Sequence, residues 1–271
     1  MIKNKIKNTN SPKDNVKKRK NKQKFNLKTF VYFMLRFAVI VCMIRQIQLG
    51  NIMNAALCIF TLILFSITTF MEHKLNIDFP DLLEITVWVF IFSAEILGEI
   101  NEFYIHFENW DLILHTTNGF IMAGIGYSLV ELLNKNENIS VTLSPIYVAI
   151  VAICFSMTIG VLWEFFEYGV DTYLHKDMQK DTVINTIYSV KLHDEGKNKV
   201  IELPIESVVV NGQDWNEMYG GYIDIGLHDT IEDLFVNFIG AVIFSVFGYL
   251  YTIGKGKYAK NFILKRKKIS E

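Results

Sequence analysis

The sequence predicts an all-α membrane protein: a six-transmembrane-helix bundle with a small extracytoplasmic β-hairpin-like insert between helices 5 and 6. Two observations predict this class. The 271-residue chain is 51% hydrophobic, and its apolar runs reach the roughly 20 residues that a helix needs to cross a bilayer. Most of its 27 basic residues lie near the two chain ends. Because basic flanking segments stay in the cytoplasm during insertion, both termini should be cytoplasmic and the number of crossings even.

The order of segments follows from hydropathy and charge. Residues 1–28 are rich in lysine and asparagine and should form a disordered basic cytoplasmic tail. Helices 1 to 5 should lie within 29–174, with expected ranges 29–48, 51–71, 82–100, 110–133 and 145–174. Helix 6 should cover 229–254, and residues 255–271 should form a second basic cytoplasmic tail. Both tails are expected to bind anionic lipid headgroups weakly.

Local signals support these helices. Pro80 is tolerated at the start of helix 3, because its missing N–H is not needed there. In helix 4 the small residues Gly119, Ala123 and Gly126 form a ridge that predicts close contact with another helix. Arg36 lies deep in helix 1, so we expect it to have an acidic or carbonyl partner. Aromatic residues border the outer loop after helix 3, as they do at a membrane interface: Tyr104, Phe107 and Trp110.

Residues 175–228 interrupt the helical pattern. The segment is polar and net acidic, and it contains two β-like runs, 183–192 and 200–210, with a turn-like stretch between them. We interpret it as a small hairpin outside the membrane. Its aromatic residues are candidates for contact with a partner, although such residues also return to a membrane surface without any function; they are Trp215, Tyr219 and Tyr222.

Acidic residues also occur inside the predicted helices. Glu164, Glu167 and Asp171 are spaced three and four residues apart, so their carboxylates lie on one face of helix 5. A charge at the bilayer centre costs about 2.5 to 3.5 kcal/mol, so these groups need an interior face, partners or water. With the N-terminus inside, helices 3 to 6 all place acids, a histidine or an amide near the extracytoplasmic face. This sidedness favours one shared site over a structural polar cluster that only pins the bundle together.

The predicted site residues fall into two groups by role. Glu164 and Glu167 are expected to act as ligands or base and His115 as a proton donor, which makes these three the candidate catalytic residues. The candidate metal ligands are Glu95, Glu99, Asp111, Asp171, Asp229, Asp233 and Asn237. Neighbouring carboxylates cannot all stay ionised, so they need cations or protons. A lone buried histidine is more often only a hydrogen-bond partner, here of Asp111.

The chemistry of this set limits the cofactor. Oxygen-rich ligands with a single histidine suit Mg²⁺, Mn²⁺ or Ca²⁺ better than they suit structural zinc, which prefers sulfur and imidazole. No organic cofactor is expected. Cys42, Cys58 and Cys154 lie in apolar runs without CxxC spacing, which argues against a thiolate site or a disulfide framework. The sequence contains no phosphate-binding loop, Ser-His-Asp order or haem motif. We expect no nucleic-acid partner.

Several short motifs resemble a known family. They are Gly98-Glu99, Trp110-Asp111 with His115, Trp163-Glu164 with Glu167, and Asp229-Thr230 with Asp233, Asn237 and Gly240. Together they resemble the YjdF-like family of uncharacterised bacterial inner-membrane proteins. The similarity spans helices 3 to 6, while helices 1 and 2 match only as hydrophobic segments and the 175–228 insert is longer than that family implies. The resemblance implies a multi-pass protein of the bacterial cytoplasmic membrane and names no reaction.

Three functional hypotheses follow. The first is a divalent-metal-dependent membrane enzyme that acts on lipid headgroups or lipid-linked phosphates at the outer surface. The second is a cation- or proton-coupled transporter, although no polar chain reaches the cytoplasmic half and no inverted repeat is visible. The third is a non-catalytic sensor or assembly factor that uses the 175–228 insert for recognition. Membrane lipids are the expected partners, and the sequence does not identify a protein partner.

Overall fold

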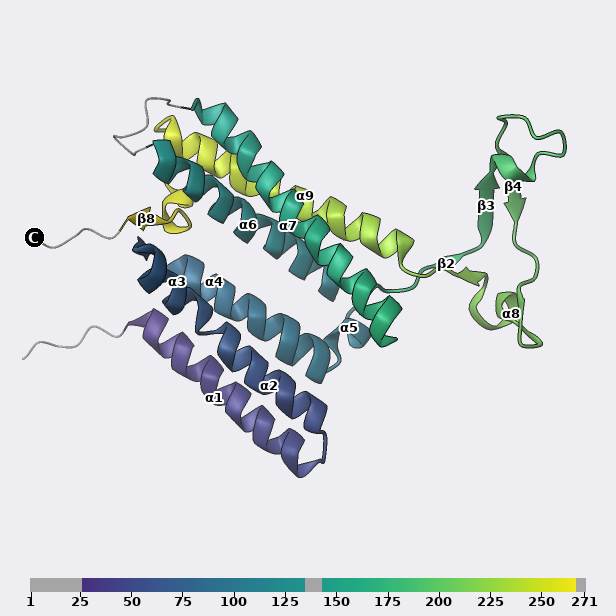
Figure 1. Ribbon diagram of the computed structural model, residues 1–271, viewed down its shortest axis with the longest axis horizontal. Coiled ribbons are helices and arrows are strands. Elements are labelled where there is room, and N and C mark those ends of the chain that lie inside the picture. Colours follow the sequence, from purple (N-terminus) through teal and green to yellow (C-terminus); the bar gives the residue numbers. More distant parts are fainter. Residues whose placement is uncertain (1–25, 135–142, 267–271) are drawn as a thin grey trace, which may run out of the picture.

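The computed structural model describes residues 26–134 and 143–266, and these form a mostly helical protein. The predictions for residues 1–25 and 267–271, at the two ends of the chain, lie outside the described residues. In Figure 1 the helices run side by side, and a β-rich arm extends from one end of the bundle. The start of α1 (Leu27–Gln48) and the end of α9 (Leu227–Thr252) lie at the opposite end.

The helices form two packed groups. In the first, α6 (Trp110–Asn134) packs most extensively against α9 and then against α7 (Pro145–Leu174). In the second, α1 packs against α2 (Ile52–Leu64) and α4 (Asp81–Phe92). The remaining helical segments are α3 (Ile67–Leu75), the π-helix η1 (Ser93–Ile100) that continues α4, and the short α5 (Phe103–His106).

Four helical segments of the described residues are long and apolar enough to cross a membrane: Leu27–Gln48, Ile52–Glu72, Pro145–Leu174 and Leu227–Thr252. Their outward faces carry exposed apolar side chains, such as Phe33 and Phe37 on α1 and Phe165 on α7. In water such surfaces would be unfavourable, whereas lipid tails accept them. The predicted helical membrane protein is therefore confirmed at the level of four candidate spans. The segments 81–100 and 110–134 pack beside these spans.

Small residues bring α6 and α9 into close contact. A Cβ at Gly119 would overlap the backbone oxygen of Asn237, and a Cβ at Gly240 would overlap the backbone oxygen of Thr116. Gly126 lies against Phe155 of α7 in the same way. The predicted ridge on helix 4 is thus confirmed as a helix-packing surface. Because the two backbones approach so closely, polar side chains at the adjoining ends of α6 and α9 are held near one another.

The structure refines one expectation about the first two helices and changes another. The expected helix 51–71 matches the candidate span Ile52–Glu72, with a short break between α2 and α3, where the Ser66 hydroxyl donates to the Leu62 carbonyl oxygen at 3.2 Å. Side-chain bonds of this kind bend helices. The same hydroxyl accepts a 2.7 Å hydrogen bond from Arg36, whose guanidinium also lies 4.4 Å from the Tyr32 ring centroid. In the part of the chain that the structure describes, the contacts of the Arg36 guanidinium are therefore a hydroxyl and an aromatic face, in place of the expected acidic or carbonyl partner.

Part of the C-terminal segment packs onto the bundle, which sequence analysis missed. The segment forms η3 (Tyr258–Asn261) and then β8 (Lys265–Arg266), which pairs antiparallel with β1 (Ile77–Asp78). Ala259, Ile263 and Leu264 are buried. The Leu264 backbone N–H also donates to the Ser128 hydroxyl of α6 at 2.9 Å. These few apolar residues between lysines attach the segment to α6 and to the α3–α4 connection.

The arm consists of short paired strands. Strand β2 (Val183–Ile184) pairs with β7 (Tyr222–Ile223) at its base, and β3 (Thr186–Ser189) pairs with β4 (Ile201–Pro204) farther along. All of these pairs are antiparallel. The second expected run, 200–210, does not form one strand, because its end belongs to a separate small hairpin. The other elements of the arm are η2 (Val190–Leu192), β5 (Val209–Val210), β6 (Gln213–Asp214) and α8 (Trp215–Tyr219).

Candidate functional site

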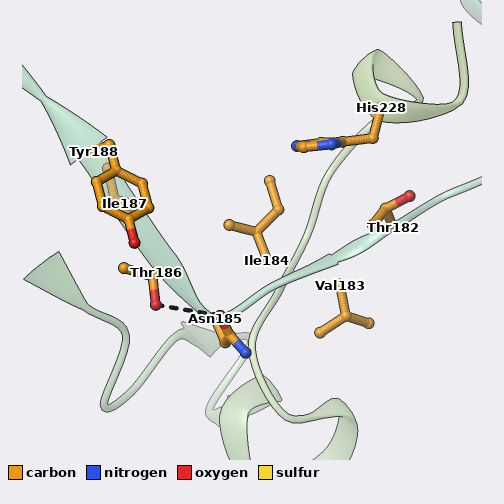
Figure 2. A pocket seen from close by; sticks show the side chains of 8 residues that line it. All are labelled: Thr182, Val183, Ile184, Asn185, Thr186, Ile187, Tyr188 and His228. Carbon is orange, nitrogen blue, oxygen red and sulfur yellow. Dashed lines mark hydrogen bonds between the residues drawn. The ribbon is translucent and has the colours of Figure 1, made fainter. Parts of the chain in front are cut away.

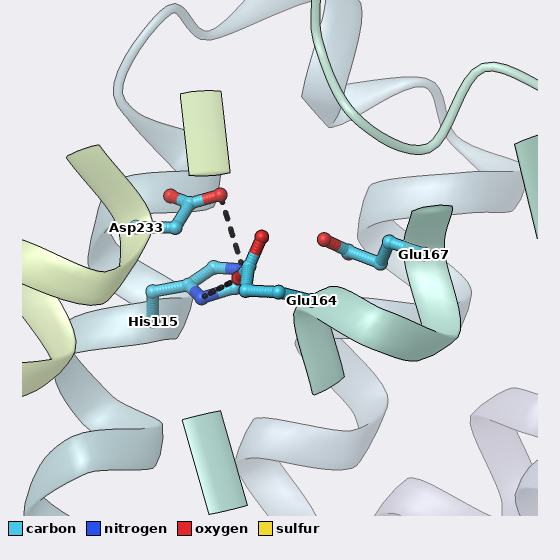
Figure 3. Close-up of side chains that lie close together, drawn as sticks. All are labelled: His115, Glu164, Glu167 and Asp233. Carbon is cyan, nitrogen blue, oxygen red and sulfur yellow. Dashed lines mark ion pairs between the residues drawn. The ribbon is translucent and has the colours of Figure 1, made fainter. Parts of the chain in front are cut away.

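A buried histidine lies at the centre of an acidic cluster at the arm end of the bundle (Figure 3). His115 of α6 places Nδ1 3.8 Å from Oε1 of Glu164, on α7. Its Nε2 lies 3.5 Å from Oδ2 of Asp233, on α9, and 3.5 Å from Oδ1 of Asp111, one turn earlier on α6. The side chains of Glu164 and Asp233 are only 4% and 1% exposed. Three helices thus direct ionisable groups to one enclosed point.

A network of amide and hydroxyl groups closes the inner side of this cluster. The Asn118 side-chain amide donates to Oδ1 of Asn237 at 3.2 Å, and the Asn237 amide donates to the Ser156 carbonyl oxygen at 3.4 Å. The Ser156 hydroxyl in turn donates to the Gly119 carbonyl oxygen at 2.9 Å. Asn237, predicted as a metal ligand, therefore joins α6, α7 and α9 one turn below Asp233.

Most of the carboxylate oxygens in the cluster accept no hydrogen bond. Among the described residues, no group forms a hydrogen bond of normal geometry to either oxygen of Glu164, to either oxygen of Asp233, or to Oε2 of Glu167. The Thr230 hydroxyl is the polar group that approaches Glu164. The other oxygen of Glu167 accepts a 2.8 Å bond from the Trp163 indole N–H. Buried polar atoms are almost always paired, and a buried charge without a partner is very costly. The cluster therefore requires protons or a cation.

The spacing of these groups fits a cation. His115, Glu164, Glu167 and Asp233 each offer one ligand atom, and these four atoms all lie within 4.8 Å of one another. Oxygen ligands lie about 2.0 to 2.6 Å from Mg²⁺ or Ca²⁺, so two ligands on opposite sides of an ion are about 4 to 5 Å apart. A second group, formed by Asp111, Asp229 and Asp233, meets the same limit. Asp233 belongs to both groups.

Asp171 and Asp229 hold a loop across the outer side of the cluster. Both carboxylate oxygens of Asp171 accept backbone hydrogen bonds, from Met178 at 2.7 Å and from Gln179 at 2.8 Å. One oxygen of Asp229 accepts the backbone N–H of Lys180 at 2.8 Å. Asp171, predicted as a metal ligand, lies in neither metal-compatible group. Carboxylates that accept backbone N–H bonds commonly anchor such turns.

The predicted ligands on helix 3 also lie outside the two groups. Glu95 is partly buried and Glu99 is exposed on the π-helix η1. The ring of Tyr104 packs directly on Gly98 between them, where a Cβ would overlap it. Burial, together with the negative charges of Asp111 and Glu99, raises the pKa of Tyr104. Its hydroxyl therefore stays protonated and remains a hydrogen-bond donor at neutral pH.

Lys180 is a site neighbour that sequence analysis missed. Its ammonium donates to the Asp177 carbonyl oxygen at 2.9 Å and lies 5.6 Å from the Tyr104 ring centroid. Its backbone N–H is the group bound to Asp229. No sequence signal identifies it, because a single lysine in a polar segment is ordinarily a solvated side chain. Only the folded loop brings it to the acidic cluster.

A hollow of about 460 Å³ lies at the base of the arm (Figure 2). It is lined by residues 182–188 and by His228, the second residue of α9. None of its lining residues is a carboxylate. Within the described residues, the buried carboxylate oxygens without a hydrogen-bond partner lie in the helical bundle and not in this hollow.

The fold and the cluster together define a helical membrane protein with a buried acid and histidine site. Comparison with protein families agrees: residues 27–254 match the family described as "Predicted membrane protein (DUF2238)", and the chain belongs to this family of predicted membrane proteins. The match covers every helix that contributes to the cluster. Neither the comparison with curated proteins nor that with solved structures returned a match.

Proposed function

We propose that this protein is a divalent-cation-dependent membrane enzyme that hydrolyses or transfers a lipid headgroup or a lipid-linked phosphate. The cation, Mg²⁺, Mn²⁺ or Ca²⁺, is held by His115, Glu164, Glu167 and Asp233. The observation that carries the proposal is that five buried carboxylate oxygens around one imidazole accept no hydrogen bond from the described residues. Such oxygens are ligands for hard divalent cations.

Glu84 is a buried acid of the bundle outside the cluster, and its charge is neutralised by a neighbouring side chain of the protein. Glu84, at the opposite end of the bundle, is 1% exposed and forms an ion pair with Lys28. Within the described residues no lysine or arginine forms an ion pair with Glu164, Glu167 or Asp233. A purely structural cluster would be expected to contain its own neutralising cation, as the Glu84 site does. The contrast supports a cation supplied from outside.

The proposed chemistry follows from what surrounds the cluster. In hydrolysis, the oxygen of a water forms a bond to phosphorus while the bond from phosphorus to the alcohol oxygen breaks. A bound cation lowers the pKa of that water and neutralises phosphate charge. With a cation bound, Glu164 or Glu167 would take the proton of the water, and His115 would return one to the leaving alcohol. Lys180 and the protonated Tyr104 lie at the outer side, where a phosphate would enter.

The membrane arrangement belongs to the same proposal. We infer that segments 81–100 and 110–134 also cross, so that six spans place both termini in the cytoplasm and the arm outside. The basic chain ends and the parallel run of all six segments in Figure 1 support this arrangement. The site then opens at the extracytoplasmic headgroup level of a bacterial cytoplasmic membrane. The YjdF-like motifs support the bacterial origin, and anionic headgroups are the proposed partners of the basic ends.

Elemental analysis and lipid turnover test the proposal together. Purified wild-type protein should bind Mn²⁺ and convert a phosphate-containing lipid. Glu164→Gln should abolish turnover and lower Mn²⁺ affinity at least tenfold while membrane insertion is unchanged. Glu232→Gln is the matched control, because Glu232 is an exposed acid next to Asp233. Unchanged lipid processing by Glu164→Gln, or a wild-type protein that binds no divalent cation, would refute the proposal.

The second candidate is a cation- or proton-coupled transporter. The chain of hydrogen bonds from Asn118 through Asn237 to Ser156 favours it, since this chain leads from the cluster toward the middle of the bundle. These groups already bind one another directly, which leaves them closed to a moving ion. Uptake of Mn²⁺ or protons into proteoliposomes along an imposed gradient, lost in Asn237→Ala and kept in Glu232→Gln, would favour transport over catalysis.

A further inference from the structure

We infer that the cluster binds a pair of divalent cations that share Asp233, and that the substrate class is a phosphate ester held between the two ions. This inference rests on the proposed function and deepens it. The first ion takes the group already described. The second ion lies on its outer side and is held by Asp111, Asp229 and Asp233, whose ligand atoms lie within 4.8 Å of one another.

The helices present these ligands in two layers. On α6, Asp111 and His115 are separated by four residues, and on α9 Asp229 and Asp233 have the same spacing. Residues four apart lie one above the other on one helix face. Because α6 and α9 pack closely at Gly119, the two pairs face each other, and His115 Nε2 lies 3.5 Å from both Asp111 and Asp233. Asp111 and Asp229 thus form an outer layer, and His115 and Asp233 form an inner layer. Asp233 belongs to the inner layer and also lies within reach of the outer acids.

The bonding state of Asp233 points to a ligand on both sides. Its side chain is 1% exposed, and neither carboxylate oxygen accepts a hydrogen bond among the described residues. An ion bound through a single oxygen would leave the other oxygen with only the His115 ring, 3.5 Å away, as a polar neighbour. A carboxylate that bridges two ions uses both oxygens. The neighbouring Glu167 differs, because Trp163 already satisfies one of its oxygens.

Within the described residues, no lysine or arginine forms an ion pair with the acids of the outer group, although Lys180 is near enough to attract Asp111 and Asp229. Lys180 is the nearest candidate, but its ammonium donates to the Asp177 carbonyl oxygen and faces the Tyr104 ring. It forms no ion pair within 4.0 Å with Asp111 or Asp229 in the described part of the chain. The side chain of Asp111 is 18% exposed, so an ion there keeps access to water or to a substrate.

The pairing of ions identifies the class of substrate. Two cations a few ångströms apart neutralise both the attacking and the leaving oxygen of a phosphate ester, which is the recurring use of such pairs. The ammonium of Lys180 lies on the outer side and can add a further positive charge to the phosphate. An apolar chain attached to that phosphate would remain among the exposed apolar faces of the helices.

Stoichiometry and magnetic coupling test the inference on the full-length protein. Wild-type protein loaded with Mn²⁺ in nanodiscs should bind two ions per chain and show the electron paramagnetic resonance signal of an exchange-coupled pair. Asp111→Asn and Asp229→Asn should each reduce binding to one ion and abolish the coupling. Glu232→Gln should keep two coupled ions. Inorganic phosphate should alter the coupled spectrum of the wild type and leave the Asp111→Asn spectrum unchanged.

The outcomes separate the two proposals. A single uncoupled Mn²⁺ in wild-type protein overturns the inference of a shared pair and leaves the proposed function standing. Two ions that remain in both Asp111→Asn and Asp229→Asn also overturn it, because the outer group would then not be their site. Absence of any bound Mn²⁺ refutes both. Since the wild-type stoichiometry and coupling are decisive alone, the test does not depend on either variant folding.

Discussion

His115 on α6 and Asp233 on α9 are 118 positions apart in the chain, yet Nε2 of one lies 3.5 Å from Oδ2 of the other. Both groups are almost completely enclosed. Four carboxylates in the two metal-compatible groups, besides Asp233, surround this pair. The single imidazole is too little positive charge for so many acids, and the stability of the empty site should therefore be limited by repulsion.

Asp233→Asn should raise the stability of the cation-free protein and remove its response to cations. The amide has the same shape without the buried negative charge, which is costly when unpaired. In the wild type, a cation at about 100 times its dissociation constant should stabilise the fold by about 2.7 kcal/mol. Thermal unfolding in detergent with and without Mn²⁺ measures both effects. Glu232→Gln should behave as the wild type, and a cation-free Asp233→Asn protein that melts below it would contradict the argument.

Gly119→Ala should separate α6 from α9 and weaken cation binding. Its new Cβ would overlap the Asn237 carbonyl oxygen, so the backbones must move apart. Overpacking of this kind costs about 1 to 3 kcal/mol. Gly169→Ala, on α7, is the matched control, because nothing lies within 4 Å of its Cβ and alanine favours a helix by about 1 kcal/mol over glycine. Unfolding midpoints and Mn²⁺ titrations measure the two variants; equal stability of the two would contradict the packing argument.

Lys28→Met should destabilise the protein more than the double substitution Lys28→Met with Glu84→Leu. The single change leaves Glu84 buried without its ion pair. Losing one partner of a buried pair costs about 3 kcal/mol or more, whereas replacing both with apolar groups is often neutral. We expect the lower part of that range, since the Lys28 side chain is 27% exposed. Denaturant unfolding of the three proteins measures the difference, and a double variant no more stable than the single one would contradict it.

The base of the arm should loosen in acid because of Asp224. Burial alone would raise the pKa of Asp224, but backbone N–H groups of Thr182, His228 and Gly226 hold the pKa below its usual range. A carboxylate with a lowered pKa stabilises the fold above its unfolded pKa of about 3.9. That contribution is lost as the pH falls through the lower folded pKa.

Hydrogen exchange in segment 182–228 measures this effect. Protection of the Thr182 and His228 amides should decrease as the pH is lowered below about 4, after correction for the intrinsic rate. Asp224→Asn should show reduced protection at neutral pH and little further change in acid. The matched control is Glu217→Gln, an exposed acid on α8 of the same arm. A wild-type arm whose protection is constant from pH 6 to pH 3 would show that the carboxylate does not clamp its base.

The sequence by itself determined the class of protein and indicated that acids and a histidine from separate helices gather near one end of the bundle. Apolar runs of membrane-spanning length and basic ends predict a helical membrane protein, and the structure retains four candidate spans. The shared depth of polar residues on separate helices, with the spacing of Glu164, Glu167 and Asp171, predicted one site of ten residues. In the structure His115, Glu164, Glu167 and Asp233 of that set lie together, and their roles stay predictions. Helix periodicity could contribute to this prediction because it is a local property, which orients side chains before any tertiary contact forms.

Only the tertiary structure decided which acids remain available as ligands. Asp171 has the same helical spacing as Glu164 and Glu167, yet a loop that folds back satisfies both of its oxygens. Lys180 reaches the cluster through that same loop, and Lys28 neutralises Glu84 from another helix. Whether a carboxylate keeps its charge unsatisfied depends on donors contributed by distant segments. Because those donors are brought together only by folding, sequence spacing could not distinguish the anchoring acid from the binding ones.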